Sequence, residues 1–285
     1  MIKFLGNENS ADTIENAQTV IVPVPLEYST SYGKGTAFGP RAIIEASQYL
    51  EFYDEELDFE PWKTGVYTSP AIEVEGTPET CLRNIEKSVS GYLNDGQFLI
   101  VIGGEHTLSY AVHRAFMARY PGVSVLQFDA HTDLRDSYEG SPYSHACVMR
   151  RIREDNQRIV SVGIRSQCIE ERKYILENRI PVFYAHEFQG NDAVPKILNQ
   201  LSEDVFITFD TDFFDPAIMP GVGTPEPGGF FWYETLSILK NVFENKNVVG
   251  MDIVEFSPIK NLTHPQFLLA KFIYKMIGYK INSKI

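Results

Sequence analysis

The sequence predicts an α/β fold in which a central, mainly parallel sheet lies between two layers of helices, a three-layer αβα arrangement. Short runs of consecutive β-branched and apolar residues are typical of strands that are buried on both faces. Longer amphipathic segments alternate with these runs at the spacing of βαβ units. No linker-like segment or internal repeat divides the 285 residues, so residues 1–285 are expected to form one domain.

Seven segments match the strand pattern well, and an eighth, at residues 64–67, matches it more weakly. Most of the seven carry apolar side chains at consecutive positions and not at alternating ones, which indicates a sheet covered on both faces. The seven predicted strands are residues 19–23, 98–102, 123–128, 159–164, 180–184, 205–209 and 248–253.

Helical periodicity predicts seven helices between these runs. Pro40 and Pro78 stand in the first turn of two of them, where a missing backbone N–H is tolerated. The longest stretch with neither pattern is residues 214–231, which is rich in proline and glycine. A loop of this length in a compact domain usually has a function, so we expect it to form one wall of a site. The predicted helices are residues 40–52, 78–93, 106–120, 169–178, 193–201, 233–243 and 265–277.

The chain carries 25 Lys and Arg against 38 Asp and Glu, a formal net charge of −13. This balance argues against a protein that coats nucleic acid or an anionic membrane, because both require a basic surface, and it suits a cationic small-molecule partner. The acidic residues at 51–60 are interpreted as a solvated face and not as a ligand site. Four lysines near the C-terminus suit the last turns of a terminal helix. They are Lys271, Lys275, Lys280 and Lys284.

Cys81, Cys147 and Cys168 are too few and too scattered for a disulfide framework or a thiolate metal site. Residues 1–10 lack a basic segment followed by an apolar stretch, so we expect no signal peptide. No run approaches the roughly 18 consecutive apolar residues of a membrane span. These features predict a soluble, cytoplasmic protein.

Acidic and imidazole side chains directly follow two of the predicted strands. Asp129, His131 and Asp133 come after one apolar run, and Asp210 and Asp212 come after another. Side chains at positions i, i+2 and i+4 of extended backbone point the same way, so each set can converge on one point. The carboxyl ends of buried strands are where α/β sheets build their sites.

These aspartates have two interpretations. A single Asp after a strand is most often the N-cap of the next helix. Several carboxylates at the mouth of an apolar sheet, however, repel one another and lose hydration unless cations compensate them, and metal ions are the simplest such cations. A third apolar run is followed by Gly103-Gly104-Glu105-His106, where the paired glycines permit a sharp turn that brings another imidazole to the same crevice.

Together the three motifs predict a divalent-metal site. A mixture of imidazoles and carboxylates suits a pair of hard or borderline ions, with manganese favoured and zinc, cobalt or nickel as alternatives. Thiolate zinc is excluded, because no cysteine lies in the motifs. The candidate ligands are His106, Asp129, His131, Asp133, Asp210 and Asp212.

Two further residues could complete a reaction centre. His145 lies where a loop over the metals would run, and Glu255 ends the strand-like run near residue 253. Each taken alone is more often structural than functional. A nucleophilic pair of Cys147 with His145 is disfavoured, because adjacent side chains in extended backbone point apart. The remaining histidines have no motif context and are interpreted as structural. They are His113, His186 and His264.

As a set, the motifs resemble the ureohydrolase (arginase–agmatinase) family, and within it the agmatinase branch. The similarity runs from about Val20 to the final helix, and the early segment at 29–47 resembles the substrate-side loop and first helix of that family. The motifs are GGEH (103–106), DAHTD (129–133), SHA (144–146), FDTDFFDP (209–216), GTPEPGG (223–229) and MDIVEFSP (251–258).

The resemblance implies a parallel eight-stranded sheet between helices and a homo-oligomer, either a trimer or a hexamer. It also implies a binuclear manganese centre in which Asp129 and Asp210 bridge the two ions, with His106 and Asp133 completing one site and His131 and Asp212 the other. Two residues would act on the substrate: His145 would be a mobile proton shuttle, and Glu255 would anchor the guanidinium group. The implied reaction is hydrolysis of agmatine to putrescine and urea, a step of polyamine biosynthesis.

Glu105 and Thr107 stand where many relatives have Asp and Ser, and Ala146 and Cys147 also depart from the common pattern. None is a candidate ligand, so these departures could change the pocket but not the chemistry. The GIRS segment at 163–166 is the agmatinase-like form. Other substrates stay open, namely guanidinobutyrate, guanidinopropionate, formiminoglutamate and arginine. So do two other functions, a binuclear phosphoesterase and a non-catalytic binding module.

Overall fold

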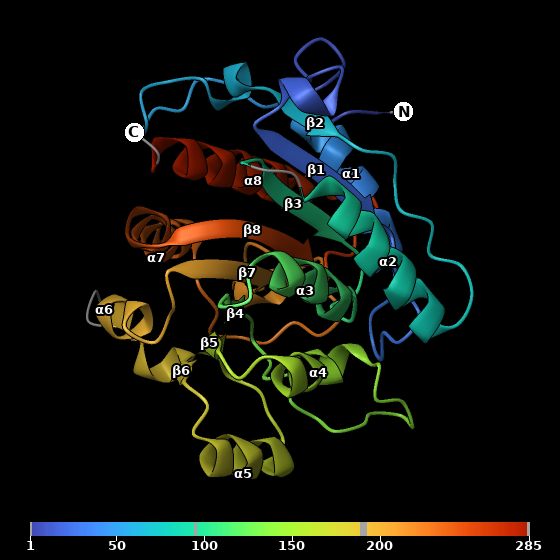
Figure 1. The fold of residues 1–285 in the computed structure, drawn as a ribbon, viewed down its shortest axis with the longest axis vertical. Helices are drawn as coiled ribbons and strands as arrows, with labels where there is room; N and C mark the ends of the chain where they lie inside the picture. Colours follow the sequence, from blue (N-terminus) through green and yellow to red (C-terminus); the bar gives the residue numbers. More distant parts are fainter. Residues whose placement is uncertain (1, 94–95, 189–192, 284–285) are drawn as a thin grey trace.

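The computed structural model describes residues 2–93, 96–188 and 193–283. Its centre is one eight-stranded sheet with strand order β2-β1-β3-β8-β7-β4-β5-β6, and all neighbouring strands run parallel (Figure 1). The predicted fold class is confirmed, including the weak strand β2. The strands are β1 (Thr19–Val24), β2 (Val66–Thr68), β3 (Phe98–Gly103), β4 (Ser124–Phe128), β5 (Ile159–Ile164), β6 (Val182–Tyr184), β7 (Asp204–Asp210) and β8 (Asn247–Val254).

Helices cover both faces of the sheet (Figure 1). Consecutive residues of a strand alternate between the two faces, so Phe206 packs under one layer and Ile207 under the other, which explains the unbroken apolar runs. No helix among the described residues has both the length and the apolar character needed to span a membrane. One layer holds α2 (Pro78–Tyr92), α3 (Leu108–Arg119), α4 (Val148–Asp155) and α5 (Ile169–Asn178); the other holds α1 (Gly39–Ser47), α6 (Ala193–Leu198), α7 (Trp232–Asn245) and α8 (His264–Asn282).

The sequence-based prediction missed α4 and made α1 too long. The α4 segment buries Val148, Met149 and Ile152 at helical spacing, so the pattern was present beneath its charged residues. Helix α1 ends at Ser47 and not near residue 52. The Ser47 hydroxyl donates to the carbonyl of Ile44 and accepts from a backbone N–H near the N-terminus, which ties the end of the helix to that segment.

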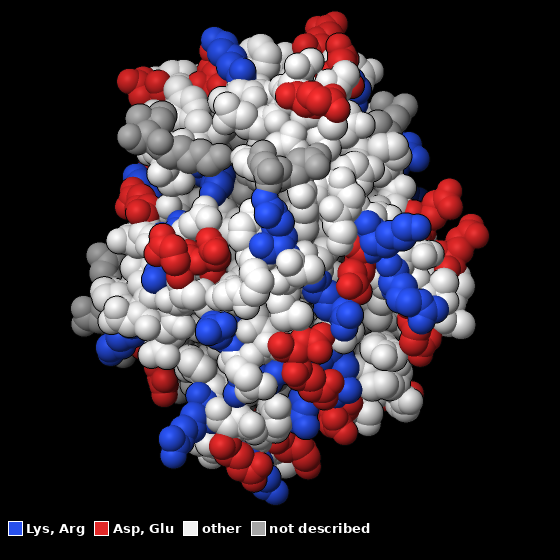
Figure 2. Space-filling model, viewed as in Figure 1, with Lys and Arg blue, Asp and Glu red and all other residues white. Residues whose placement is uncertain are grey.

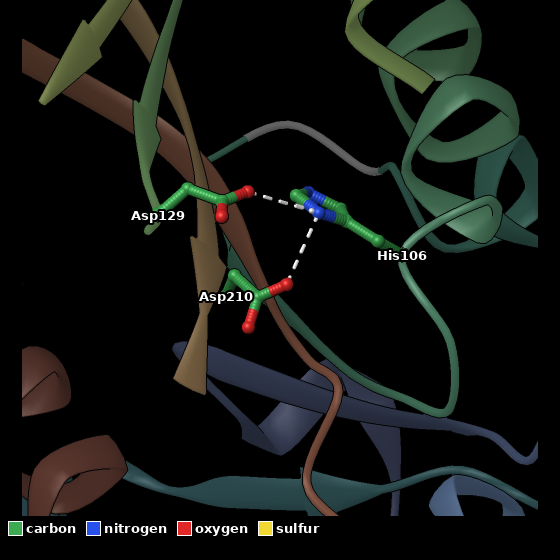
Figure 3. A group of neighbouring side chains, drawn as sticks. All are labelled: His106, Asp129 and Asp210. Carbon is green, nitrogen blue, oxygen red and sulfur yellow. Dashed lines mark ion pairs between the residues drawn. The ribbon is translucent and has the colours of Figure 1, made fainter. Parts of the chain in front are cut away.

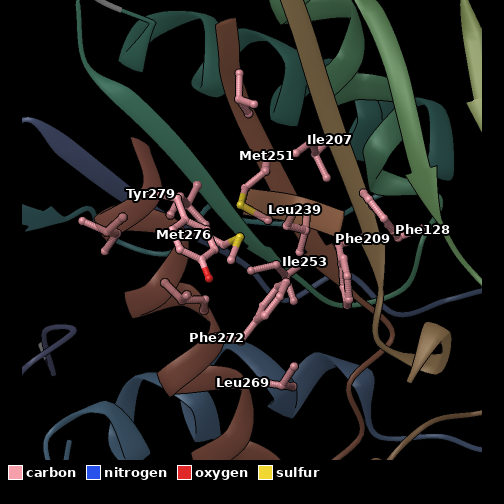
Figure 4. Close-up of a cluster of buried hydrophobic side chains, with 14 of the residues drawn as sticks. Phe128, Ile207, Phe209, Leu239, Met251, Ile253, Leu269, Phe272, Met276 and Tyr279 are labelled. Carbon is pink, nitrogen blue, oxygen red and sulfur yellow. The ribbon is translucent and has the colours of Figure 1, made fainter. Parts of the chain in front are cut away.

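Aromatic packing fixes the carboxyl ends of the central strands. The ring of Phe209 on β7 lies 4.6 Å from that of Phe272 on α8 and 5.6 Å from that of Phe128 on β4 (Figure 4). All three side chains are fully buried. Each such ring removes about 150–250 Å² of surface from water, so this contact is among the strongest in the core. The next residues along β4 and β7 are Asp129 and Asp210, and their backbone positions are therefore set by the core.

The acidic segment, residues 51–60, was predicted to be a solvated face, but part of it is buried. Asp54 is fully buried and accepts a hydrogen bond from Lys275 of α8 at 2.8 Å, and the Lys275 side chain is only 2% exposed. Glu56 accepts from Lys275, from the Tyr279 hydroxyl and from Lys240. The prediction of a solvated face is wrong for Asp54, and Lys275 lies in the middle of α8, not in its last turns. This part of the segment fastens α8 to the rest of the chain.

Other charges are distributed over the surface. Figure 2 shows basic and acidic side chains interspersed over one face, with no large patch of a single sign in that view. Lys271 lies over the ring of Tyr274, and Lys280 donates to Asn247, while Lys284 lies outside the described residues. The three cysteines are unpaired with one another, and two of them are buried.

Candidate functional site

The predicted site residues follow four strands that are neighbours in the sheet, in the order β3-β8-β7-β4. His106 comes after the glycine turn that ends β3, Asp129 directly follows β4, Asp210 ends β7 and Glu255 follows β8. Because parallel strands end at one edge, these side chains meet there. The sharp turn after β3 depends on Gly104, where a Cβ atom would come within 1.9 Å of the carbonyl oxygen of Leu26.

His106 is surrounded by three aspartates. Its Nδ1 lies 3.3 Å from an oxygen of Asp129 and 3.3 Å from one of Asp210 (Figure 3). It also lies 3.0 Å from an oxygen of Asp133. All four residues are buried. Yet His106 Nδ1 has no well-formed hydrogen bond, so a buried polar atom points at three carboxylates without a regular partner.

A second group shares Asp129 with the first. His131 Nδ1 lies 2.8 Å from an oxygen of Asp212 and 3.6 Å from the other oxygen of Asp129. The ligand atoms of each of the two groups, His106-Asp129-Asp210 and Asp129-His131-Asp212, lie within 4.8 Å of one another. Asp210 belongs to the first group, and its other oxygen accepts the backbone N–H of Asp212. We call the five residues of these two groups, together with Asp133, the aspartate–imidazole cluster.

The electrostatics of this cluster are unbalanced. Burial and then the charge of Asp129 raise the pKa of Asp133 to about 7, and burial followed by the charges of Asp212 and Asp129 raises the pKa of Asp210 well above its usual value. Burial opposes ionisation of Asp129 as well, but the neighbouring imidazoles of His106 and His131 hold its pKa below the usual range. Among the described residues, the ion pairs of these aspartates include no lysine or arginine.

The donor set therefore fits divalent cations. Four aspartates offset the charge of two such ions, and imidazole nitrogens with carboxylate oxygens are the ligands of hard or borderline metals. The unpartnered Nδ1 of His106 supports this fit, because an imidazole nitrogen directed at several carboxylates is placed where a metal ligand would be. Asp133 and Glu255 also have left-handed backbones, with φ of 50° and 65°. Such strain in non-glycine residues concentrates at functional sites.

Glu255 and His145 lie beside this cluster. An oxygen of Glu255 accepts the backbone N–H of His106 at 2.6 Å, and burial followed by the charge of Glu105 raises the pKa of Glu255 to about 8. His145 begins a short 3-10 helix, and burial lowers its pKa to about 4. Both residues line a cavity of about 240 Å³ together with His131, Asp133, Asp210 and Asp212.

The proline- and glycine-rich loop at 214–231 does form one side of this cavity, as predicted, through Thr224. A carboxylate oxygen of Glu226 in the same loop lies 3.8 Å from Nε2 of His131. The loop is fastened by Arg165, whose guanidinium donates to the backbone carbonyls of Glu226 and Asp212. Arg165 thus couples the loop to the end of β7.

Several supporting residues were not predicted. Nε2 of His106 lies 2.9 Å from the hydroxyl of Thr208, which donates to the buried carboxylate of Asp252 at 2.7 Å. Gln127 donates to an oxygen of Asp129. Such contacts orient ligands at metal sites. An acidic residue in the otherwise apolar β8 indicates that Asp252 has a special role, but nothing in the sequence places it near His106.

The other histidines and cysteines stay outside the site. His113 is buried at 3.1 Å from the side chain of Asn156, and burial lowers its pKa to about 4. His186 and His264 are exposed. Burial raises the pKa of Cys147 to about 11, which opposes a thiolate role.

Comparisons with known proteins agree with this geometry. A family model described as "Arginase family" matches residues 17–278. An N(1)-aminopropylagmatine ureohydrolase from Synechocystis sp. is 40% identical over 97% of this chain and 93% of its own length. An agmatinase from Bacillus anthracis is 35% identical over 94% of this chain and 93% of its own length. The crystal structure of an agmatine ureohydrolase from Thermoplasma volcanium, 29% identical, superimposes with a TM-score of 0.90 over 100% of this chain and 96% of that chain.

Proposed function

The chain belongs to the arginase family, whose members are binuclear metal-dependent hydrolases of guanidino C–N bonds, and from this premise we propose that it hydrolyses agmatine to putrescine and urea. One observation supports the proposal above others. Four residues of the aspartate–imidazole cluster line a single cavity at the sheet edge together with the buried Glu255 and with His145. The four are His131, Asp133, Asp210 and Asp212. That combination offers metal ligands, an anionic anchor for a cationic substrate and a proton-transfer group in one place.

We propose manganese as the metal, held by all six residues of the aspartate–imidazole cluster. When bound, two divalent ions would lower the pKa of a water molecule and stabilise the negative charge that develops during hydrolysis. A guanidinium carbon is a poor electrophile because its charge is delocalised, so this assistance is needed at neutral pH.

Glu255 is proposed to anchor the guanidinium. A carboxylate binds that planar group through paired, charge-assisted hydrogen bonds. Burial and the charge of Glu105 raise the pKa of Glu255, and a cationic group beside it favours the charged carboxylate, so a guanidinium is a well-matched partner for this side chain.

His145 is proposed to deliver a proton to the departing amine. The leaving group is a strong base once the C–N bond weakens, and an imidazole beside the cavity can transfer a proton near neutral pH. Burial lowers the pKa of His145, so its ring is neutral at rest. It would first take up the proton that the attacking water gives up and then pass that proton to the departing amine.

A second candidate substrate is N1-aminopropylagmatine, because the Synechocystis relative carries that activity in its name. Both molecules present the same guanidinium group and differ only in the length and charge of the amine tail. The aspartate–imidazole cluster and Glu255 therefore do not distinguish them, and we propose that other residues lining the cavity, such as Thr224 and Gln167, make the choice.

A urea-release assay tests the proposal. The manganese-loaded protein is offered agmatine, N1-aminopropylagmatine, guanidinobutyrate and arginine, and kcat/KM is measured for each. We expect the highest kcat/KM with agmatine. A higher kcat/KM with N1-aminopropylagmatine would make that longer molecule the substrate. Release of urea only from guanidinobutyrate or arginine would overturn the proposal that agmatine is the substrate. Phosphate release from a generic ester, without urea from any guanidino compound, would favour the phosphoesterase alternative.

We also propose that the chain assembles as a homo-oligomer, a trimer or hexamer. Large apolar side chains are exposed near the N-terminal ends of α7 and α8, including Tyr233 (80% exposed), Phe231 (49%) and Phe267 (43%). Clustered exposed aromatics are typical of interaction surfaces. Light scattering coupled to size-exclusion chromatography measures the mass in solution, and a monomer would contradict this proposal.

A further inference from the structure

Glu105 departs from the common family pattern, and the structure places it away from the aspartate–imidazole cluster. Although it precedes His106, its carboxylate reaches back to the segment that follows β1. One oxygen accepts the backbone N–H groups of Tyr28 and Ser29, both at 2.7 Å, and the other lies 2.7 Å from the Ser29 hydroxyl. Glu105 is fully buried. A buried carboxylate with three donors from one segment holds that segment firmly.

Ser29 carries this contact onward to His145. Its hydroxyl oxygen accepts the backbone N–H of His145 at 3.0 Å and lies 3.3 Å from Nδ1 of the His145 ring. The adjacent Tyr28 hydroxyl donates to the carbonyl of Tyr143, which ties the same two segments together a second time. Glu105 and His145 are therefore linked through one hydroxyl group.

The hydrogen bonds of Ser29 have a defined direction. A hydroxyl has a single proton, and here it is donated to the carboxylate of Glu105, because a carboxylate only accepts. The Ser29 oxygen can then only accept from His145. The Ser29 contact therefore favours a proton on Nδ1 of His145, which has the Ser144 hydroxyl as a second neighbour at 3.4 Å. Nε2 is then the acceptor nitrogen of the ring, with the Ser31 hydroxyl 3.4 Å away.

We propose that Glu105 is a positioning residue: through Ser29 it fixes the ring orientation of His145 and holds the proton of the neutral ring on Nδ1. Nε2 is then the nitrogen that takes up and delivers a proton. This inference rests on the proposed function in one respect, since it treats His145 as the proton-transfer group. It goes beyond that function by assigning a role to a residue that touches neither the proposed metal ligands nor the substrate.

Glu105→Gln reverses the direction of the hydrogen bond between residue 105 and the Ser29 hydroxyl while keeping a side chain of nearly the same shape. The amide oxygen can still accept the two backbone N–H groups, but the amide nitrogen donates to Ser29 where the carboxylate accepted. The Ser29 proton is then free to bond Nδ1 of His145, which favours the opposite tautomer. Glu105→Asp keeps an acceptor and should keep the original tautomer. Glu27→Gln is the matched control: Glu27 binds the backbone N–H groups of Gly35 and Ala37 in the same loop, with no hydrogen bond to Ser29 or His145.

Neutron diffraction of the deuterated, metal-loaded protein locates the proton without any turnover. We expect a deuteron on Nδ1 of His145 in the wild type and in Glu105→Asp, and on Nε2 in Glu105→Gln. A deuteron on Nε2 in the wild type, or the same ring nitrogen deuterated in wild type and Glu105→Gln, would overturn the proposal. This readout tests the role of Glu105 separately from the proposed function, because it remains valid even if the wild type releases no urea.

Kinetics supply the second readout. Loss of a correctly held general acid lowers rates by about 10²-fold or more, so we expect Glu105→Gln to lower kcat about 10- to 100-fold with metal content nearly unchanged. Ser29→Ala should have a similar effect, and Glu27→Gln almost none. In a His145→Ala background, Glu105→Gln should cause no additional loss. An equal loss in both backgrounds, or a fall in bound metal, would show that Glu105 acts elsewhere.

Discussion

Two regions of the molecule gather carboxylates at buried positions, and they resolve the resulting repulsion differently. In the acidic segment, Asp54 and Glu56 face Lys275 and Lys240, two cations that the chain itself provides. In the aspartate–imidazole cluster, four aspartates face only two imidazoles. The first arrangement is electrically complete and fastens α8. The second is complete only with cations from outside the chain.

The difference separates a structural carboxylate cluster from the one that we propose to be catalytic. Both are acidic, partly buried and surrounded by apolar side chains, so acidity and burial alone do not distinguish them. The source of the compensating charge does. The following predictions test this distinction.

The largest effect is expected for Asp129→Asn. This aspartate belongs to both groups of the aspartate–imidazole cluster, so its neutralisation removes charge from both proposed metal positions. We expect urea release to fall by at least about 10³-fold, the order of magnitude lost with a principal catalytic group, while the unfolding midpoint of the metal-free protein changes little.

Asp136→Asn is the control for that substitution. Asp136 lies in the same stretch of chain but is exposed and pairs with Arg151. Its removal should leave urea release within about twofold of wild type, as is usual for exposed ion pairs. Equal losses in the two variants would contradict the special status of Asp129.

The acidic segment should respond in the opposite way to Lys275→Met. This change leaves Asp54 buried without its cation, and breaking a buried ion pair in this manner destabilises a protein by about 3–5 kcal/mol. Activity per folded molecule should be unchanged. Denaturant unfolding measures the loss, and replacing Asp54 by Leu in the same chain should recover much of it. If Lys275→Met lost activity while its free energy of unfolding stayed at the wild-type value, the structural role of Lys275 would be contradicted.

Manganese should stabilise the folded protein only through the aspartate–imidazole cluster. A ligand at a hundredfold excess over its dissociation constant stabilises the native state by about 2.7 kcal/mol. We expect the unfolding midpoint to rise with added manganese in wild type and in Lys275→Met, and to stay nearly constant in Asp129→Asn. A rise that persists in Asp129→Asn would place the metal elsewhere.

The smallest effect is a pH dependence at Glu56. Burial opposes its ionisation, but hydrogen bonds from Lys240 and Lys275 outweigh this and lower its pKa from 4.5 to about 2. A lowered pKa contributes stability that is present above the unfolded value and is lost as the pH falls through the folded one. The stability difference between wild type and Glu56→Gln should therefore shrink between about pH 4.5 and pH 2. A difference independent of pH would indicate that the charge of Glu56 does not matter.

Much of the fold was predictable, because it depends on local patterns. Buried parallel strands carry consecutive apolar residues, and all eight strands were found on that basis. The convergence of Asp129 with His131 and of Asp210 with Asp212 follows from the alternation of side chains in extended backbone. Helix α4 was missed although Val148, Met149 and Ile152 have helical spacing, because its arginines hid that pattern.

The supporting contacts were not predictable, because they depend on the order of strands in the sheet. Asp252 reaches His106 through Thr208 only because β8 lies between β3 and β7. The pairing of Asp54 with Lys275 joins residues 221 positions apart. Local sequence patterns carry no information about such distant neighbours, so the acidic segment was interpreted as solvated throughout.

Manganese binding to the purified protein, with elemental analysis of the bound metal per chain, tests the central claim most directly. If the aspartate–imidazole cluster requires outside cations, the wild type will hold about two ions per chain and Asp129→Asn will hold fewer than one. A wild type that binds no divalent ion, or an Asp129→Asn variant that binds as many ions as the wild type, would contradict it.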